Sequence, residues 1–405
     1  MMNPGDVAWM LTASSMVLFM TPGLAFFYGG MVSAKNVIST MLQCFIALGV
    51  VSVLWIVVGF SLSFGDSIGG LVGNPLTYFM FQNVSEATDA RLSPTIPLLL
   101  FALFQLKFAI ITPALITGAF AERVRFAAYL LFVTLFTLVI YAPLAHWTWH
   151  PDGFLRQWGV LDFAGGTVVH MSAGLAALAG AHVLGRRQSH IAGEANVPAH
   201  IPFIILGTGM LWFGWFGFNA GSALAANATA VLAFATTNTA SAAAMMAWIG
   251  FEWMRGLKPS AMGACIGAVV GLVAITPAAG FVSVPAGIAI GVLAAAASNV
   301  ALHWRSKSTI DDTLDVFPCH GVGGMAGMVL TAVFANDGGL ITTGNAQLLF
   351  THLAALAIVS VFTFGGSWLI YKLVDVVTPL RVDEQNEQLG LDLSQHGENY
   401  GLFEA

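Results

Sequence analysis

The chain has 405 residues, of which 57% are hydrophobic and only 8% are charged. Soluble domains carry about 25% charged residues, so this composition excludes an ordinary water-soluble protein and indicates a polytopic membrane protein. A formal net charge of −6 without any basic block argues against nucleic-acid binding. Three cysteines, Cys44, Cys265 and Cys319, show neither a metal-ligand spacing nor a disulfide framework.

Eleven apolar segments are long enough to be candidate membrane-spanning helices, which need about 20 residues to cross a hydrocarbon core of about 30 Å. In chain order they cover residues 7–29, 37–64, 97–120, 126–146, 163–184, 201–219, 231–254, 261–276, 285–304, 316–334 and 348–376. The break between the eighth and ninth segments, residues 277–284, is itself apolar and is the least distinct boundary. We expect residues 1–376 to form a membrane domain and residues 377–405 to form a polar tail.

Lysine and arginine residues indicate the orientation, because short cytoplasmic loops are enriched in them. With the N-terminus outside, eleven of these residues fall on the cytoplasmic side, only Arg91 and Arg156 fall outside, and Lys107 falls within the third span. We therefore expect eleven crossings, N-out and C-in, with the first span as an uncleaved signal anchor. A charge at the depth of Lys107 is costly, and it could be accommodated by snorkelling, by pairing or at a subunit contact.

One spacing, an Asp followed by a His eight residues later, occurs twice. Asp162 and His170 lie in DFAGGTVVH at the start of the fifth span, and Asp312 and His320 lie in DTLDVFPCH, which begins just ahead of the tenth. The two spans are five apart and run in opposite directions, which predicts inverted halves at about 7–185 and 201–334 with a final helix at about 348–376. If helical, eight residues rise about 12 Å, so the two histidines are expected to meet near the midplane.

An ionisable residue inside a membrane is by default a candidate functional residue, and the symmetric pair His170 and His320 is a candidate pore and proton-relay pair. The alternative is that each imidazole only hydrogen-bonds a backbone carbonyl in the bundle core. Asp162 and Asp312 are expected mainly to cap the N–H groups where their helices start. The negative charge of Asp162 would also favour a cation at the outer mouth.

Four further side chains lie in other spans: Phe108 in the third, Trp149 at the outer end of the fourth, and Phe218 and Ser222 at the outer end of the sixth. Aromatic faces attract cations, and a hydroxyl group adds an acceptor for an N–H donor. The alternative is that the aromatic residues only anchor the protein at the membrane interface.

Several segments together resemble the Amt/Rh/Mep ammonium transporter family, on the Amt side. They are MTPGLAFFYGGMVSAKN, FAIITPALITGAFAERVRF, LDFAGGTVVHMSAG, WFGWFGFNAGSA, TTNTASAAAMMAW, DDTLDVFPCHGVGG and the tail segment GLDLSQHGENYG. The resemblance covers essentially the whole chain, and the two Asp–His segments are its most specific part. It implies an all-α fold of eleven transmembrane helices and a homotrimer in the plasma (inner) membrane, with no cofactor, no metal and no catalytic residues.

The resemblance also implies the roles of individual residues. The residues of substrate recruitment would be Phe108, Trp149 and Ser222, supported by Asp162. Phe108 and Phe218 would form a gate of stacked phenyl rings, and His170 and His320 would form the twin-histidine pair of the pore. The implied substrate is ammonium or ammonia, with methylammonium as an analogue. Residues 377–405 resemble a regulatory tail that packs under the neighbouring subunit, in a family whose cytoplasmic face binds a PII signal protein.

A mechanism follows from the difference between ammonium and potassium, which are similar in size and equal in charge. Only ammonium can release a proton, and an apolar pore does not replace the water around an ion. We expect NH4+ to deprotonate at or below the gate and NH3 to cross past the histidines, with the proton either relayed by them or left outside. The alternatives are an ammonium sensor (transceptor) and a channel of the Rh type for a neutral gas.

Two motifs of hydrolytic enzymes, HExxH and GxSxG, give no support for an enzymatic function. The sequence contains no HExxH. Residues 65–69, GDSIG, match GxSxG around Ser67, but they fall in a loop after the second span, without the strand-to-helix turn that gives that motif its meaning.

Overall fold

The computed structural model describes residues 1–401, and these residues are mainly helical. The predicted all-α membrane fold is therefore confirmed. Among the described residues, ten helices are long and apolar enough to cross a membrane. The predicted eighth span corresponds to a shorter apolar helix, α12 (Ala261–Ile275), of 15 residues. It is separated from the next helix by an irregular segment, as the sequence predicts.

Many spans consist of consecutive helical segments, and two small hairpins lie between the second and third spans. Up to residue 191 the elements are α1 (Pro4–Met31), η1 (Ala34–Asn36), α2 (Val37–Leu54), η2 (Trp55–Gly59), α3 (Phe60–Phe64), β1 (Ser67–Ile68), β2 (Val72–Gly73), η3 (Phe79–Phe81), β3 (Thr88–Asp89), β4 (Ser93–Pro97), α4 (Leu98–Phe120), α5 (Phe126–Phe136), η4 (Thr137–Tyr141), α6 (Ala142–Trp149), α7 (Phe154–Gln157), η5 (Gly166–Met171), α8 (Ser172–Leu184) and α9 (Gln188–Ile191). From residue 201 they are α10 (Ile201–Gly221), α11 (Ala228–Met254), α12, α13 (Val284–Ser306), η6 (Phe317–Val322), α14 (Gly323–Phe334), α15 (Leu340–Thr343), α16 (Gln347–Val377), α17 (Glu384–Leu389) and α18 (Leu391–His396).

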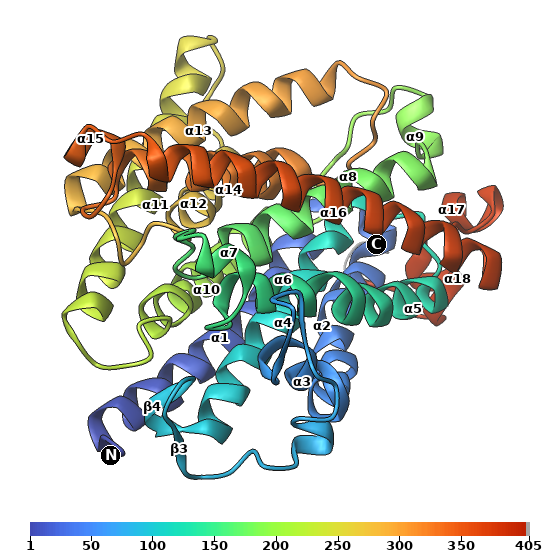
Figure 1. Ribbon diagram of the computed structural model, residues 1–405. Coiled ribbons are helices and arrows are strands. Elements are labelled where there is room, and N and C mark those ends of the chain that lie inside the picture. Colours follow the sequence, from blue (N-terminus) through green and yellow to red (C-terminus); the bar gives the residue numbers. More distant parts are fainter. Residues whose placement is uncertain (402–405) are drawn as a thin grey trace.

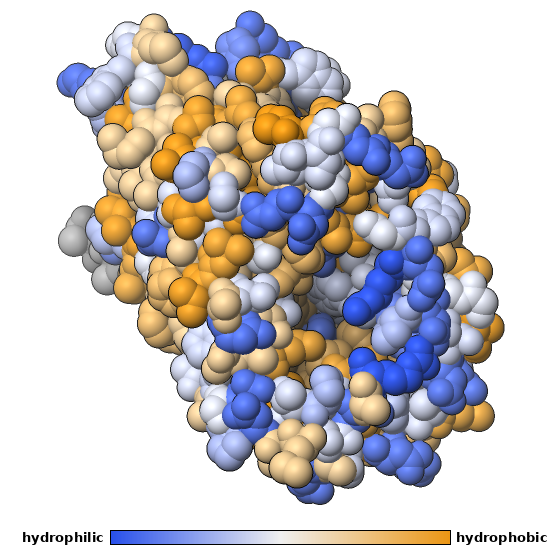
Figure 2. Space-filling model, turned by 60° about the vertical axis from the view of Figure 1, so that its left-hand side comes forward, coloured by the Kyte–Doolittle hydropathy of each residue, from blue (hydrophilic) through white to orange (hydrophobic). Residues whose placement is uncertain are grey.

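The bundle has two distinct ends (Figure 1). Helix α16 runs across the molecule from α15 at one end to α17 and α18 at the other. We call the end that holds the N-terminus and the β3–β4 hairpin the vestibule end, and the end that holds α17 and α18 the tail end. Many large apolar side chains are exposed, and the space-filling view of one face shows apolar patches beside hydrophilic ones (Figure 2). Exposed apolar patches of this kind suit contact with lipid.

The two predicted histidine-bearing spans each begin with a π-helical segment, η5 and η6. The chain between Asp162 and Gly165 is irregular, and Gly165 adopts a left-handed conformation with φ 117°. The assumption that the whole stretch from Asp to His is helical is therefore wrong, because the helix begins only at Gly166. Widened turns of this kind are frequent at functional sites.

Two glycines allow these spans to cross at close range. Helix α8 packs on η6, and α14 packs reciprocally on η5. A Cβ on Gly174 would collide with the backbone of Gly321, and a Cβ on Gly324 would press against Gly166 and His170. Gly174 and Gly324 occupy the same place, twelve residues after Asp162 and Asp312. Such reciprocal packing is what an inverted repeat is expected to produce.

Buried ion pairs hold three loops together at the tail end. Asp311 is fully buried and accepts two hydrogen bonds from the guanidinium of Arg187, at 2.9 and 3.0 Å. Arg187 also pairs with Glu122 at 2.5 Å, and Arg123 donates to the backbone carbonyl of Asp311 at 2.6 Å. Burial alone would raise the pKa of Asp311, but the hydrogen bonds from Arg187 and the charges of Arg123 and Arg187 lower it to about 2. These pairs therefore stabilise the native state at every pH above the ordinary carboxylate pKa of about 4, and they weaken as the pH falls toward 2.

The described part of the C-terminal tail, residues 377–401, is folded against its own chain, and the last four residues of the expected tail lie outside the described residues. The Asp392 carboxylate accepts hydrogen bonds from the backbone N–H groups of Ile38 and Ser39, at 3.0 and 2.7 Å, and so caps the start of α2. The backbone N–H of Leu391 donates to Asn36, and Lys35 donates to the carbonyl of Gln388. Residues 388–392, which are distant in sequence, thus hold together the connection between α1 and α2 at the tail end.

A substitution of Gly174 by Ala tests the close crossing of the two histidine spans. The added methyl group must displace the backbone of η6, and such overpacking costs about 1–3 kcal/mol. We expect Gly174→Ala to lower the midpoint of thermal unfolding in detergent. The matched control is Gly209→Ala in α10, where a Cβ would meet nothing within 4 Å. An unfolding midpoint for Gly174→Ala equal to that of Gly209→Ala would contradict the proposed crossing.

Candidate functional site

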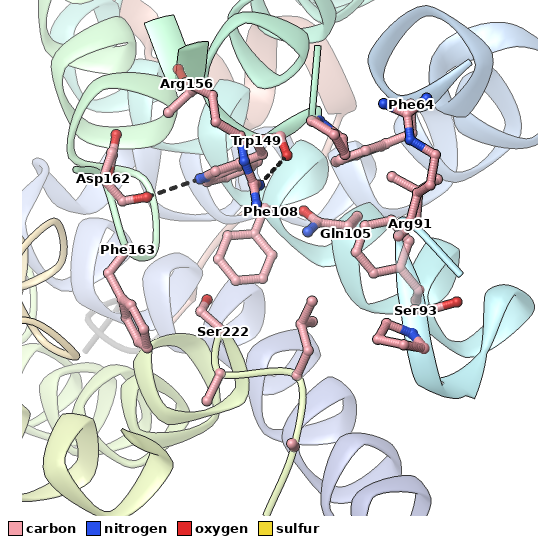
Figure 3. Close-up of a pocket in the computed structure, with 18 of the residues that line it drawn as sticks. Phe64, Arg91, Ser93, Gln105, Phe108, Trp149, Arg156, Asp162, Phe163 and Ser222 are labelled. Atoms are coloured by element: carbon pink, nitrogen blue, oxygen red, sulfur yellow. Dashed lines mark hydrogen bonds between the residues drawn. The ribbon is translucent and has the colours of Figure 1, made fainter. Parts of the chain in front are cut away.

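A cavity of about 580 Å³ opens at the vestibule end. The four predicted recruitment residues come from four different spans and all line it: Phe108, Trp149, Asp162 and Ser222. Figure 3 shows them around one space, with Trp149 above Phe108 and Ser222 below it. Folding therefore brings together four residues that are up to 114 positions apart in the sequence.

Asp162 lies beside this cavity with its carboxylate already fully engaged. One oxygen accepts from the N–H groups of Gly165 and Gly166, at 2.8 and 2.7 Å, and the other accepts from the N–H and the hydroxyl of Thr167, at 2.7 and 2.5 Å. A carboxylate offers about four acceptor sites, so none remains for a ligand. Its direct effects are to cap η5 and to place a fixed negative charge beneath the vestibule. Asp312 caps η6 in the same way through Val316 and Phe317.

The aromatic side chains form the floor of the cavity. The indole N–H of Trp149 donates to the backbone carbonyl of Asp162 at 3.2 Å, which fixes the ring next to Phe108, with centroids 5.7 Å apart. Phe108 then lies against Phe218 with centroids 4.2 Å apart, and both rings are buried. The Ser222 hydroxyl donates to the carbonyl of Phe218 at 2.8 Å. Its oxygen lone pairs therefore remain available to an N–H donor in the cavity.

The two histidines lie directly beyond the phenyl rings. The ring centroid of His170 is 6.0 Å from that of Phe218, and the His170 ring is stacked on Trp215 with centroids 5.3 Å apart. Nδ1 of His170 is 3.3 Å from Nδ1 of His320, and both side chains are buried. His320 in turn borders a cavity of about 10 Å³, roughly the space of one water molecule. A continuous row of rings thus joins the vestibule to this small cavity on the far side.

Sequence reasoning missed several residues of this pathway. Gln105 lines the vestibule, is only 8% exposed, and its Oε1 has no hydrogen-bond partner in the described part of the chain. It lies one helical turn before Phe108, so the 3.6-residue period could have identified it. Arg91 and Arg156 also line the cavity; Arg91 pairs with Asp152 at 2.7 Å, and Arg156 donates to the carbonyl of Trp149.

Lys107 remains outside this site. Its side chain is half-buried on α4 beside Phe108, and within residues 1–401 it makes no hydrogen bond or ion pair. Leu103 and Leu99, four and eight residues earlier, are half-buried on the same stripe of the helix. The side-chain amino group of Lys107 thus lies on a different side of α4 from the vestibule.

The GDSIG segment does contact a histidine, but its geometry is that of a structural tie. Ser67 Oγ lies 2.8 Å from Nε2 of His146, and Nδ1 of His146 lies 3.0 Å from the carbonyl oxygen of Ser63. The Ser67 oxygen also accepts the N–H of Gly70. Strand β1 has only two residues and leads to β2 rather than to a helix. These contacts join the first hairpin to α6, and Ser67 does not line the vestibule.

Known proteins resemble this chain over nearly its whole length. The family model described as Ammonium Transporter Family matches residues 8–400. The chain belongs to the ammonium transporter family. An ammonium transporter of Bacillus subtilis is 45% identical over 407 residues, with 98% of each chain covered. A putative ammonium transporter of Methanothermobacter thermautotrophicus is 43% identical over 408 residues, again with 98% of each chain covered. The family resemblance read from the motifs is confirmed.

Solved structures of this family share the fold. The crystal structure of Saccharomyces cerevisiae Mep2 superimposes with a TM-score of 0.91 at 33% identity, covering 100% of this chain and 93% of Mep2. A structure described as a sensor Amt protein gives a TM-score of 0.89 at 30% identity, covering 97% of this chain and 98% of that one. This chain is therefore a membrane-spanning member of the ammonium transporter family.

Replacement of Asp162 tests how the vestibule floor is held. Asp162→Ala leaves three buried N–H groups without an acceptor, and each such loss costs about 1–3 kcal/mol. We expect a lower midpoint of thermal unfolding and a large loss of methylammonium uptake. The control is Asp152→Ala, which removes an exposed carboxylate at the same end and is expected to leave stability nearly unchanged. Equal effects of the two substitutions would contradict the capping role of Asp162.

Proposed function

We propose that this protein transports ammonium by binding NH4+ in the vestibule, removing its proton near the phenyl rings and conducting NH3 past the two histidines. The observation that carries the proposal is the unbroken row from the vestibule through Phe108 and Phe218 to His170 and His320. The names of the relatives support ammonium as the substrate.

The vestibule suits a small cation with N–H groups. The faces of Trp149 and Phe108 supply electron density, and cation–π contacts contribute about 0.5–2 kcal/mol each. The Ser222 oxygen supplies an acceptor, and Asp162 supplies negative charge without occupying the space. Methylammonium offers the same chemistry and is the practical tracer.

Selectivity against potassium follows from what lies below. Phe108 and Phe218 are packed together and buried, so an ion that passes them loses its hydration shell without replacement ligands. Desolvation of a charge in a medium of low polarity is very costly, whereas the desolvation of NH3 costs only the free energy of removing a neutral polar group from water. Potassium has no proton to lose and is excluded. The imidazoles then provide polar contacts for NH3 in an otherwise apolar path.

We further propose eleven crossings, with the vestibule end and N-terminus outside and the tail end in the cytoplasm of a cell whose plasma (inner) membrane holds the protein as a homotrimer. The distribution of Lys and Arg supports this orientation. Tail residues 377–405 would be regulatory, with a PII protein binding at the cytoplasmic face; co-purification with a PII partner under nitrogen excess tests this.

A second candidate function is that of an ammonium sensor (transceptor), which the likeness to the sensor Amt structure favours. A sensor that transports little would bind ammonium in the vestibule without passing it on. The Rh-type neutral gas channel has no specific observation in its favour, because the aromatic and hydroxyl groups of the vestibule suit a cation. Uptake measurements separate transport from sensing.

The histidine pair can be tested by uptake of radiolabelled methylammonium into proteoliposomes. We expect His170→Ala and His320→Ala to reduce uptake or to admit potassium as a competitor, because the polar contacts between the apolar segments are lost. His303→Ala in α13, which changes an exposed histidine, serves as the control and is expected to behave as wild type. Wild-type uptake and selectivity in both pore variants would refute the role of the pair.

A further inference from the structure

The hydroxyl of Thr276, just after α12, lies at the centre of three hydrogen bonds. It is 2.8 Å from the carbonyl oxygen of Leu272, 2.9 Å from the indole nitrogen of Trp215 and 3.3 Å from Nε2 of His170. Thr276 is fully buried. A hydroxyl group has one proton to donate and two lone pairs to accept with, so the roles of the three partners can be worked out.

The single hydroxyl proton of Thr276 goes to Leu272. The backbone N–H of Thr276 bonds to the carbonyl of Val273, one residue short of the usual α-helical partner. The hydroxyl therefore replaces that N–H as the donor to Leu272, at the shortest of its three distances. The indole of Trp215 can only donate. Thr276 Oγ is thus an acceptor toward Trp215 and has one lone pair left, which faces His170.

This arrangement determines which ring nitrogens carry protons. Because Thr276 Oγ accepts, Nε2 of His170 must be the protonated nitrogen, and Nδ1 of the neutral ring then carries the lone pair. The contact of 3.3 Å between the two Nδ1 atoms needs one proton, so Nδ1–H of His320 is its donor. Nε2 of His320 is left as an acceptor. We infer that Thr276 is a positioning residue that holds the pair in this one tautomeric arrangement, with His170 protonated on Nε2 and His320 on Nδ1.

The consequence for a proton relay rests on the proposed function. In the inferred arrangement, the two imidazoles together have one free lone pair. It belongs to Nε2 of His320, on the side away from the vestibule. A proton moving inward from the vestibule needs the opposite arrangement: it binds Nε2 of His170, the proton on Nδ1 of His170 passes to Nδ1 of His320, and the proton on Nε2 of His320 leaves. That transfer ends in the arrangement that Thr276 stabilises. The pair must then be reset before a second proton follows, so Thr276 opposes repeated proton transfer while leaving polar contacts for NH3.

The assignment can be tested by solid-state NMR of protein labelled with ¹⁵N and ¹³C in lipid bilayers at neutral pH. The two pore imidazoles are identified by their contacts with each other and with the side-chain carbons of Thr276. We expect protonated Nε2 and bare Nδ1 for His170, and protonated Nδ1 and bare Nε2 for His320. The reversed pattern, or equal populations of both patterns in the wild type, would overturn the inference.

Variants separate the hydroxyl from its general packing role. Thr276→Ser keeps the hydroxyl and should retain the wild-type pattern, whereas Thr276→Val removes it and should give a mixture of the two arrangements. Thr331→Val is the matched control, because that buried hydroxyl donates to the carbonyl of Gly327 in its own helix. An unchanged pattern in a folded Thr276→Val protein would refute the inference, and if that variant does not fold, the wild-type and Thr276→Ser spectra decide. These spectra need no transport activity, so a failure here is distinct from a failure of the proposed ammonium transport.

Discussion

The contact between Nδ1 of His170 and Nδ1 of His320 depends on two helix starts meeting deep inside an apolar bundle. Each start is irregular, and each is held by an aspartate that accepts the free N–H groups of its π-helical segment. Glycines then let the two segments cross at backbone distance. Because unsatisfied polar groups are very costly in lipid, this polar crossing is stable only when every donor has its acceptor.

The same constraint shapes both ends of the molecule. At the vestibule end, the Asp162 carboxylate uses all its acceptor sites in hydrogen bonds at the start of η5. The backbone carbonyl of Asp162 accepts the indole N–H of Trp149 and so positions that ring. At the tail end, the fully buried Asp311 precedes Asp312, so the ion pairs with Arg187 fix the loop that leads into η6. Charges therefore stay outside the row of rings, and the path between the two ends is left to phenyl and imidazole groups.

Periodicity and composition predict most of the helices, and the repeated Asp–His spacing predicts that His170 and His320 meet. The sequence predicts the helix starts poorly, because the geometry after Asp162 depends on a left-handed glycine and on a π-helical turn that hydropathy does not encode. It also gives no signal for Thr276, which follows a short helix and reaches His170 only through tertiary packing. Helical periodicity could have identified Gln105, whereas Arg156 lies on the four-residue helix α7, outside the expected spans.

The most direct test of the account is the current that an ammonium pulse evokes from proteoliposomes on a solid-supported membrane, compared with a potassium pulse. We predict a current in response to ammonium, or internal alkalinisation reported by a pH-sensitive dye if NH3 crosses without its proton, and no response to potassium. Equal currents for the two cations would contradict a path that requires loss of a proton. The absence of both a current and a pH change after an ammonium pulse would contradict transport altogether and favour sensing.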